Sequence, residues 1–331
     1  MPTSTPPTPL SSPARSPRSP GQRLKIACVA FVAAGSLTLS ISTLPLSAED
    51  PLPHKSLAEL RTAAKAGKPQ ALLDLADELR FGADATDEQK AESITWYRRA
   101  AEKGIAEAQN HLGIVLWSGE FVEQDRNEAN RWFRRAADQG DADSQFWLAS
   151  SYEMGEGGLK SDSTEAAKWY RRAADQGHPE AQSSLGQLYE YGSGVPQDDA
   201  RAAGWYRKAA DQKNPSGEHN LAKMYAAGRG VAKDDKQAFL LFERAAERND
   251  PASMVALGEA YEQGRGAARN PVCAYFWYAV AEERGYGGKL DALRAHLSEA
   301  ERAEGERLAA AATVEDGAVR HPACPGTMPS R

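Results

Sequence analysis

An aromatic pair recurs along the chain at a nearly constant spacing, and this period limits the fold more than any other feature. The pair is Trp-Tyr or Trp-Phe in five places and Leu-Phe in one, and consecutive pairs lie 36 or 37 residues apart. Such a period is typical of proteins built from one repeated supersecondary unit. The pairs begin at Trp96, Trp132, Trp169, Trp205, Leu241 and Trp277.

A series of leucines lies 20 or 21 residues ahead of the pairs and predicts the first helix of each unit, helix A. Each leucine is followed at once by Gly or Ala, four positions later by Leu or Tyr, and seven positions later by Gly. Residues at i and i+4 share a helix face, and glycine ends a helix because it adopts the left-handed conformation without strain. The leucines are Leu75, Leu112, Leu148, Leu185, Leu221 and Leu257.

The aromatic pairs lie in a second helix, helix B, and are expected to be core residues. An Asp or Asn seven residues before five of the pairs is typical of an N-cap, and Glu128 and Glu165 predict two capping boxes. Glycines are expected to end helix B in four repeats, whereas Lys213 and Asn249 replace them in two. The predicted N-caps are Asp125, Asp162, Asp198, Asp234 and Asn270.

One helix pair cannot bury its apolar face, whereas stacked pairs can, so the sequence predicts a solenoid. Ser298 and Glu301 predict a capping box in a helix that follows the repeats. We expect a capping helix in residues 49–69, six repeats in 70–286, capping helices in 287–312 and a flexible tail in 313–331.

The repeat resembles the Sel-1-like repeat of the tetratricopeptide superfamily. The resemblance is carried by LGQLYEYGSGVPQDDARAAGWYRKAA at 185–210, by LAKMYAAGRGVAKDD at 221–235 and by LGEAYEQGRGAARN at 257–270. It implies an all-α fold, a right-handed superhelical α/α solenoid with helical caps, and a role in binding other proteins. It also implies an adaptor role, which exported bacterial members have in signalling, envelope or host-contact systems, and one subset has been linked to penicillin binding.

The first 48 residues have the composition of a leader. Residues 1–20 are mostly Pro, Ser and Thr and are expected to be disordered. A basic cluster, the mostly apolar stretch 26–41 and small residues ending at Ala48 follow in the order of a secretory signal peptide. Cleavage after Ala48 predicts a periplasmic or secreted protein. The alternatives are an uncleaved inner-membrane tether through residues 26–48, with the repeats facing the periplasm, and a segment that does neither.

Charge and motifs argue against a nucleic-acid partner and against catalysis. The first 48 residues hold four of the 40 basic residues and none of the 46 acidic ones, so the rest of the chain has a net negative charge. A protein surface that binds the phosphates of a nucleic acid is basic instead. The sequence has no zinc-spaced histidine pair, Cys-x-x-Cys, Gly-x-Ser-x-Gly or Ser-x-x-Lys. We therefore predict a non-enzymatic protein without catalytic residues, metal or cofactor. The alternative, a penicillin-binding or lactam-hydrolysing enzyme, rests on the family association alone.

Two cysteines lie in the C-terminal region. In an exported protein, Cys273 and Cys324 can form a disulfide that attaches the tail to the last repeat. The alternative is a buried small residue at Cys273 and a free thiol at Cys324.

The face of helix A opposite the series leucine predicts where a partner protein binds. This face holds positions −2, +2, +5 and +6 from the leucine and, in a stack of this type, lines the concave groove. Repeats two to four place apolar side chains there beside Asn110, Glu153 and Glu190, a mixture that suits a peptide or protein site. The alternative is that some of these side chains pack between repeats. The predicted binding residues are Ile114, Trp117, Phe146, Met154, Gln187 and Tyr191.

Overall fold

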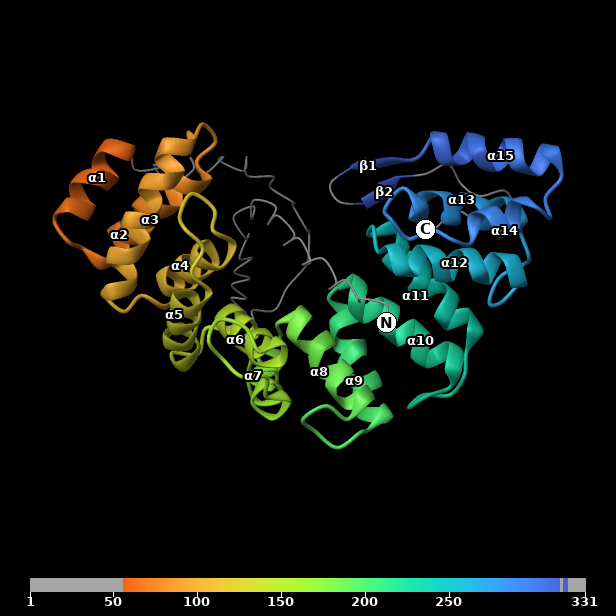
Figure 1. Cartoon of the computed structure of the whole chain (residues 1–331), viewed down its shortest axis with the longest axis horizontal. Helices are drawn as coiled ribbons and strands as arrows, with labels where there is room; N and C mark the ends of the chain where they lie inside the picture. Colours follow the sequence, from red (N-terminus) through yellow and green to blue (C-terminus); the bar gives the residue numbers. More distant parts are fainter. Residues whose placement is uncertain (1–55, 316–317, 321–331) are drawn as a thin grey trace, which may run out of the picture. The chain divides into compact units, whose positions relative to one another are not determined.

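The computed structural model describes residues 56–315 and 318–320, so the predictions for residues 1–48 and for Cys324 lie outside it. In this part of the chain, fifteen helices follow one another in sequence order (Figure 1). From α1 to α12, each helix packs mainly against its neighbours in the sequence. The predicted all-α solenoid of six repeats is confirmed.

Each repeat consists of two antiparallel helices of similar length, which alternate along the stack. The A helices are α2 (Pro69–Phe81), α4 (Ala106–Ser118), α6 (Ala142–Met154), α8 (Pro179–Tyr191), α10 (Pro215–Ala227) and α12 (Pro251–Gln263). The B helices are α3 (Asp87–Glu102), α5 (Arg126–Asp138), α7 (Ser163–Asp175), α9 (Asp199–Asp211), α11 (Asp235–Glu247) and α13 (Pro271–Glu282).

The B-helix aromatic residues hold the two helices of a repeat together. All six pairs are buried, as predicted. The small residue after the series leucine lets the helices approach closely. A Cβ added to Gly113 would lie 2.5 Å from the Phe133 ring, and one added to Gly186 would lie 2.6 Å from the Tyr206 ring.

The predicted N-caps of the B helices are confirmed, but the two capping boxes are not formed. A capping box needs the backbone N–H of the cap to bind the N3 carboxylate. In α5 the N–H of Asp125 instead donates to the Leu116 carbonyl at 3.0 Å. The Glu128 carboxylate is therefore available to Arg98 of the preceding repeat, and Glu165 of α7 pairs with Lys168.

The glycines predicted to end the A helices are left-handed in repeats two to six, with φ between 67° and 74°. Gly82 also ends its helix, as predicted, but its φ of −56° is not left-handed. The turn of repeat one has Asp84 where later turns have a second left-handed glycine or Phe121, and it takes a different path. In the B helices, Lys213 and Asn249 adopt φ values of 63° and 64° at the position that glycine occupies in other repeats.

Additional elements cover both ends of the stack. Helix α1 (Leu57–Lys65) packs on α2 at the N-terminal end. At the other end, α14 (Leu290–Arg294) and α15 (Glu299–Ala310) pack on α13, and the predicted capping box of Ser298 and Glu301 is formed.

The C-terminal segment differs from the expected flexible tail over residues 313–320. Strands β1 (Thr313–Glu315) and β2 (Ala318–Arg320) form an antiparallel hairpin in which Val314 lies opposite Val319. The Val319 side chain is buried and β2 contacts α11, so apolar burial orders this segment.

The cysteine prediction is tested only at one of its two residues. Cys273 is buried in α13. Cys324 lies outside the described residues, so the disulfide stays a prediction.

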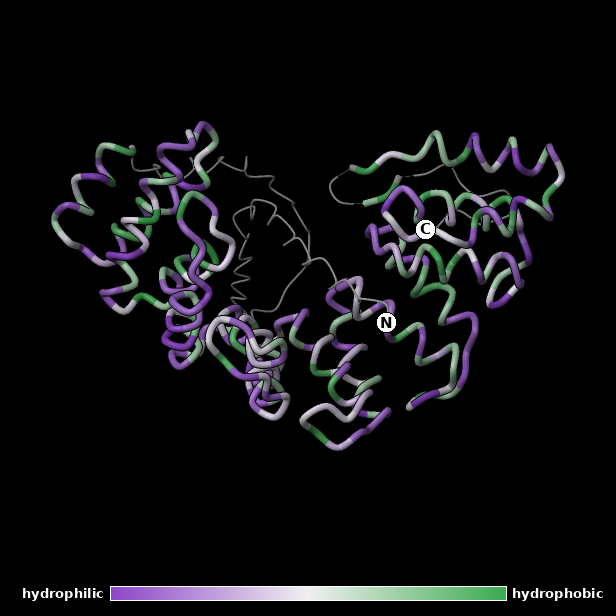
Figure 2. Tube along the Cα trace, viewed as in Figure 1, coloured by the Kyte–Doolittle hydropathy of each residue, from purple (hydrophilic) through white to green (hydrophobic). Residues whose placement is uncertain are grey.

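Polar and apolar residues are mixed along every repeat, as expected for helices that each bury one face (Figure 2). Among the described residues, no helix is both long enough and apolar enough to cross a membrane. The predicted signal peptide or tether at residues 26–48 lies outside this part of the chain.

The close contact at Gly186 predicts that this residue cannot be enlarged. We expect Gly186→Ala to lower the free energy of unfolding by about 1–3 kcal/mol, because its methyl group would overlap the Tyr206 ring. Gly204→Ala in α9 is the matched control, because no atom lies within 4 Å of a Cβ added there. That change should stabilise the protein by about 0.5–1 kcal/mol through helix propensity. Urea unfolding of both variants tests this, and equal effects would contradict it.

Candidate protein-interaction surface

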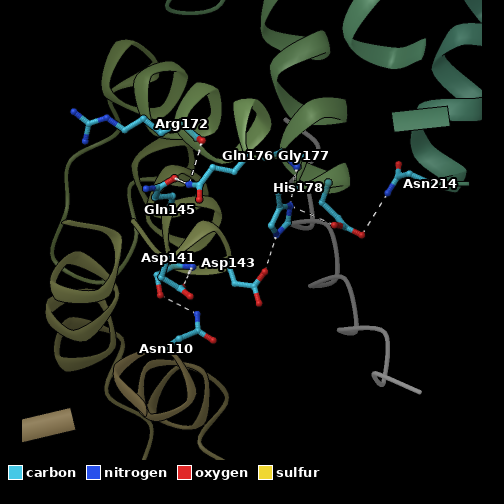
Figure 3. Close-up of polar contacts among 12 residues, drawn as sticks. Asn110, Asp141, Asp143, Gln145, Arg172, Gln176, Gly177, His178 and Asn214 are labelled. Atoms are coloured by element: carbon cyan, nitrogen blue, oxygen red, sulfur yellow. Dashed lines mark hydrogen bonds and ion pairs between the residues drawn. The ribbon is translucent and has the colours of Figure 1, made fainter. Parts of the chain in front are cut away.

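Polar side chains join neighbouring A helices along the stack. The contacts link His111 to Asp77 (3.2 Å), Asn110 to Ser144 (2.8 Å), His178 to Asp143 (3.3 Å) and Asn214 to Glu180 (3.4 Å). Figure 3 shows His178 directed toward Asp143 of the preceding repeat. Its Nδ1 also accepts the N–H of Ala181 at 3.2 Å and so caps α8. Because these contacts fix the register of the A helices, equivalent positions form rows along the stack.

Aromatic rings make a second connection between the A helices of repeats two to four. The Phe133 ring stacks on Trp147 with 5.6 Å between centroids, and the Trp117 ring lies 5.8 Å from Trp147. Phe146 continues the row, because its ring stacks on His178, the N-cap residue of α8, with 4.9 Å between centroids. Aromatic pairs of this kind stabilise proteins by about 0.5–1.5 kcal/mol beyond the burial of their area. Trp117 and Phe146 therefore contribute to the packing between repeats.

The aromatic row replaces a polar pair found in other repeats. In four repeats a helix B tyrosine donates its hydroxyl hydrogen to a helix A carboxylate of the same repeat. These pairs are Tyr97 with Asp77, Tyr170 with Glu153, Tyr206 with Glu190 and Tyr278 with Glu262, at 2.7–2.9 Å. Repeat two has Phe133 and Trp117 in place of a tyrosine and a carboxylate. The donor and the acceptor of this pair are lost together, so neither of the two is left buried without the other.

The predicted binding residues divide into two groups in the structure. Ile114, Trp117 and Phe146 are half-buried against the core, which agrees with the alternative that some of them pack between repeats. Met154, Gln187 and Tyr191 are exposed, with 56% of the Met154 surface and 64% of the Tyr191 surface accessible.

The expectation that positions −2 and +5 face outward is wrong at two polar residues. Asn110 at −2 is buried because it donates to Ser144 of the next A helix. Glu190 at +5 is buried because it accepts from Tyr206.

The outward face of each A helix instead holds positions −5, +2 and +6. These positions fall within about 40° of one another at 100° per residue, and none is buried in repeats one to four. Phe81 belongs to this face with 66% of its surface exposed, although the binding residues predicted from the sequence did not include it. Its place six residues after Leu75 could have identified it. We call these twelve residues the exposed ridge: Gln70, Asp77, Phe81, Glu107, Ile114, Ser118, Asp143, Ser150, Met154, Glu180, Gln187 and Tyr191.

A charge network around the buried Glu190 supports the ridge beneath Tyr191. Arg229 donates to Glu190 at 2.9 Å and to Asp199 at 2.8 Å, and Tyr206 donates to Glu190 at 2.7 Å. Burial and the neighbouring carboxylate raise the pKa of Tyr206 far above its ordinary value, so its hydroxyl remains a donor. The hydrogen bond from Arg229 lowers the pKa of Asp199, so this carboxylate remains an ionised acceptor at neutral pH. The network joins repeats four and five and fixes the end of α8.

The described residues contain no group of three or more His, Cys, Asp or Glu side chains arranged to hold a metal ion. The arrangement of the ridge, exposed apolar side chains above a packed aromatic row, suits contact with another macromolecule.

The family model of the Sel1 repeat matches residues 69–105, 106–141, 142–178, 179–214, 215–250 and 251–286. The chain belongs to the Sel1 repeat family. The family that the sequence predicted, the Sel-1-like repeat family, is thus confirmed. Sel1 repeat proteins generally mediate interactions between proteins.

Two solved structures are similar to this Sel1 chain. A Sel1 repeat protein from Oxalobacter formigenes is 28% identical over 69% of this chain and 99% of its own, with a TM-score of 0.60. A protective antigen present in uropathogenic Escherichia coli strains is 28% identical over 77% of this chain, with a TM-score of 0.59. The aligned region spans 64% of the antigen's length. None of the curated proteins matches this Sel1 chain.

The two groups of predicted residues should respond differently to truncation. We expect Trp117→Ala to lower the free energy of unfolding by about 2–4 kcal/mol, because it removes a ring packed against Phe133 and Trp147. Tyr191→Ala should change it by less than about 0.5 kcal/mol, as is usual for an exposed side chain. Urea unfolding measures both. A large loss at Tyr191 would show that it is a structural residue and not a free surface.

Proposed function

We propose that this Sel1 repeat protein is a non-enzymatic scaffold of the cell envelope that binds a partner protein through its exposed ridge. The observation that carries the proposal is the row at position +6 of the A helices, where Phe81, Met154 and Tyr191 expose more than half of their surface. Solvent-exposed aromatic and methionine side chains are enriched at protein interfaces.

The same position in repeats five and six argues for a local site. There it holds Ala227 and Gln263, which cannot supply an apolar anchor. The half-buried Ile114, Trp117 and Phe146 lie on the A helices of repeats two and three and hold the apolar row in register. The proposed binding surface therefore covers repeats one to four and excludes the C-terminal repeats.

Export is the second part of the proposal. It rests on the order of basic, apolar and small residues up to Ala48, and it agrees with the similar Escherichia coli protein being a protective antigen. We expect the protein recovered from the periplasmic fraction to begin at Glu49. Its N-terminal sequence measures this. An intact leader in membrane-bound protein would support the tether through residues 26–48, and intact cytosolic protein would refute export.

The binding surface is tested by removing its apolar side chains. We expect the double variant Met154→Ser/Tyr191→Ser to lose partners that the wild-type chain captures from the envelope fraction, at least tenfold by quantitative mass spectrometry. The control is Leu240→Ser on α11, because Leu240 is also an exposed apolar residue, with 49% of its surface accessible, but lies on a B helix. Equal capture by both variants, with unchanged melting curves, would refute the ridge as the binding site.

A further inference from the structure

Charge is distributed unequally between the two kinds of helix in repeats one to four. The A helices α2, α4, α6 and α8 contain eight acidic residues and one basic residue, Arg80. The B helices α3, α5, α7 and α9 contain ten acidic and thirteen basic residues. The overall acidity of the chain does not explain this difference, because both sets of helices belong to the same repeats. The A-helix surface, which carries the exposed ridge, is therefore strongly acidic.

The acidic residues of the two helix sets also differ in their ion pairs. On the B helices, Glu92 pairs with Arg61 and Glu128 with Arg98. On the A helices, six carboxylates have no Lys or Arg partner within the described part of the chain; they are Asp74, Asp77, Glu78, Glu107, Glu153 and Glu180. Neighbouring uncharged or histidine side chains contact several of them, so their negative charge is not offset by a basic side chain.

The acidic and apolar side chains form parallel rows on the ridge. Position −5 holds Glu107, Asp143 and Glu180 near the N-terminal ends of successive A helices. Position +6 holds Met154 and Tyr191 at the C-terminal ends. Eleven residues separate the positions, which is about 16 Å along a helix at 1.5 Å per residue. A segment that lies across the A helices thus meets carboxylates along one edge and apolar side chains along the other.

Repeats five and six lack both rows. Position −5 there holds Ser216 and Ala252, and position +6 holds Ala227 and Gln263. The acidic row ends where the apolar row ends, although the fold continues through two further repeats. The combination of an acidic row with an apolar row is therefore specific to the proposed site and is not a general feature of the repeat.

From these rows we infer that the partner presents a basic, amphipathic segment, with Lys or Arg toward position −5 and apolar side chains toward position +6. Opposite charges across an interface raise the association rate and select the partner, while buried apolar side chains supply most of the affinity. This inference rests on the proposed function and specifies the chemistry of the partner.

The probe is an 18-residue synthetic peptide in which Lys occupies one helical face and Leu and Phe the other. We expect the full chain to bind it, and we expect Glu107→Gln/Glu180→Gln to weaken binding about threefold to tenfold at low salt, with the difference shrinking as salt is added. The control is Asp138→Asn/Asp175→Asn, which makes the same change in net charge at exposed positions of the B helices. It should change the affinity by less than twofold.

Several results would overturn the inference. The first is no detectable binding of the basic peptide to the full chain. The second is equal weakening of binding by Glu107→Gln/Glu180→Gln and by Asp138→Asn/Asp175→Asn. The third is equal binding of a peptide in which Glu replaces every Lys. Met154→Ser/Tyr191→Ser should weaken binding of the basic peptide as well, and unchanged binding would place the peptide elsewhere.

If this variant loses envelope partners while Glu107→Gln/Glu180→Gln keeps them, the proposed function stands and the basic partner is refuted. Thermal melting of each variant confirms that the fold is retained.

Discussion

The close approach of helix A to an aromatic ring of helix B is the contact on which the rest of the structure depends. At Gly186 the helix backbone lies so near the Tyr206 ring that a Cβ would come within 2.6 Å of it. The same contact recurs at Gly113 with Phe133 and at Gly258 with Tyr278, and alanine, the next smallest residue, holds this position in the other three repeats. Because it fixes the spacing of the helix pair, it also fixes how one pair stacks on the next, and the solenoid follows from repetition.

This contact explains why so much of the fold could be predicted from the sequence. The close approach needs a small residue and a large ring at fixed positions, and the turn needs a left-handed residue such as Gly192, so the same letters recur every 36 or 37 residues. Local features that involve only neighbouring residues, such as the N-cap Asp125 and the capping box of Ser298, were predictable for the same reason.

Features that depend on contacts between repeats were not predictable in the same way. The spacing of Asp125 and Glu128 suggested a capping box, but the N–H of the cap donates to helix A and the carboxylate binds Arg98 of another repeat. Glu190 was expected at the surface, yet Tyr206 and Arg229 enclose it. Helix periodicity gives the direction of a side chain but not the neighbour that covers it. Three of the six predicted binding residues are half-buried for this reason.

The repeats also provide an internal comparison that separates folding from function. The residues that recur in every repeat maintain the stack. On the exposed ridge the residues differ between repeats, so they can be selected for binding a partner without affecting the stack. The exposed ridge of α6 and α8 should therefore accept the residues of α10 without loss of the fold. The chain with Ser150→Lys, Met154→Ala, Gln187→Lys and Tyr191→Ala carries the repeat-five residues Lys223 and Ala227 at positions +2 and +6 of both helices.

The most direct test measures the free energy of unfolding and the capture of envelope partners by this four-residue variant. We predict an unfolding free energy within about 1 kcal/mol of the wild-type value, because only surface residues change, together with loss of capture. Unfolding at much lower urea, or capture equal to that of the wild-type chain, would contradict the claim that this ridge is a binding surface separate from the core.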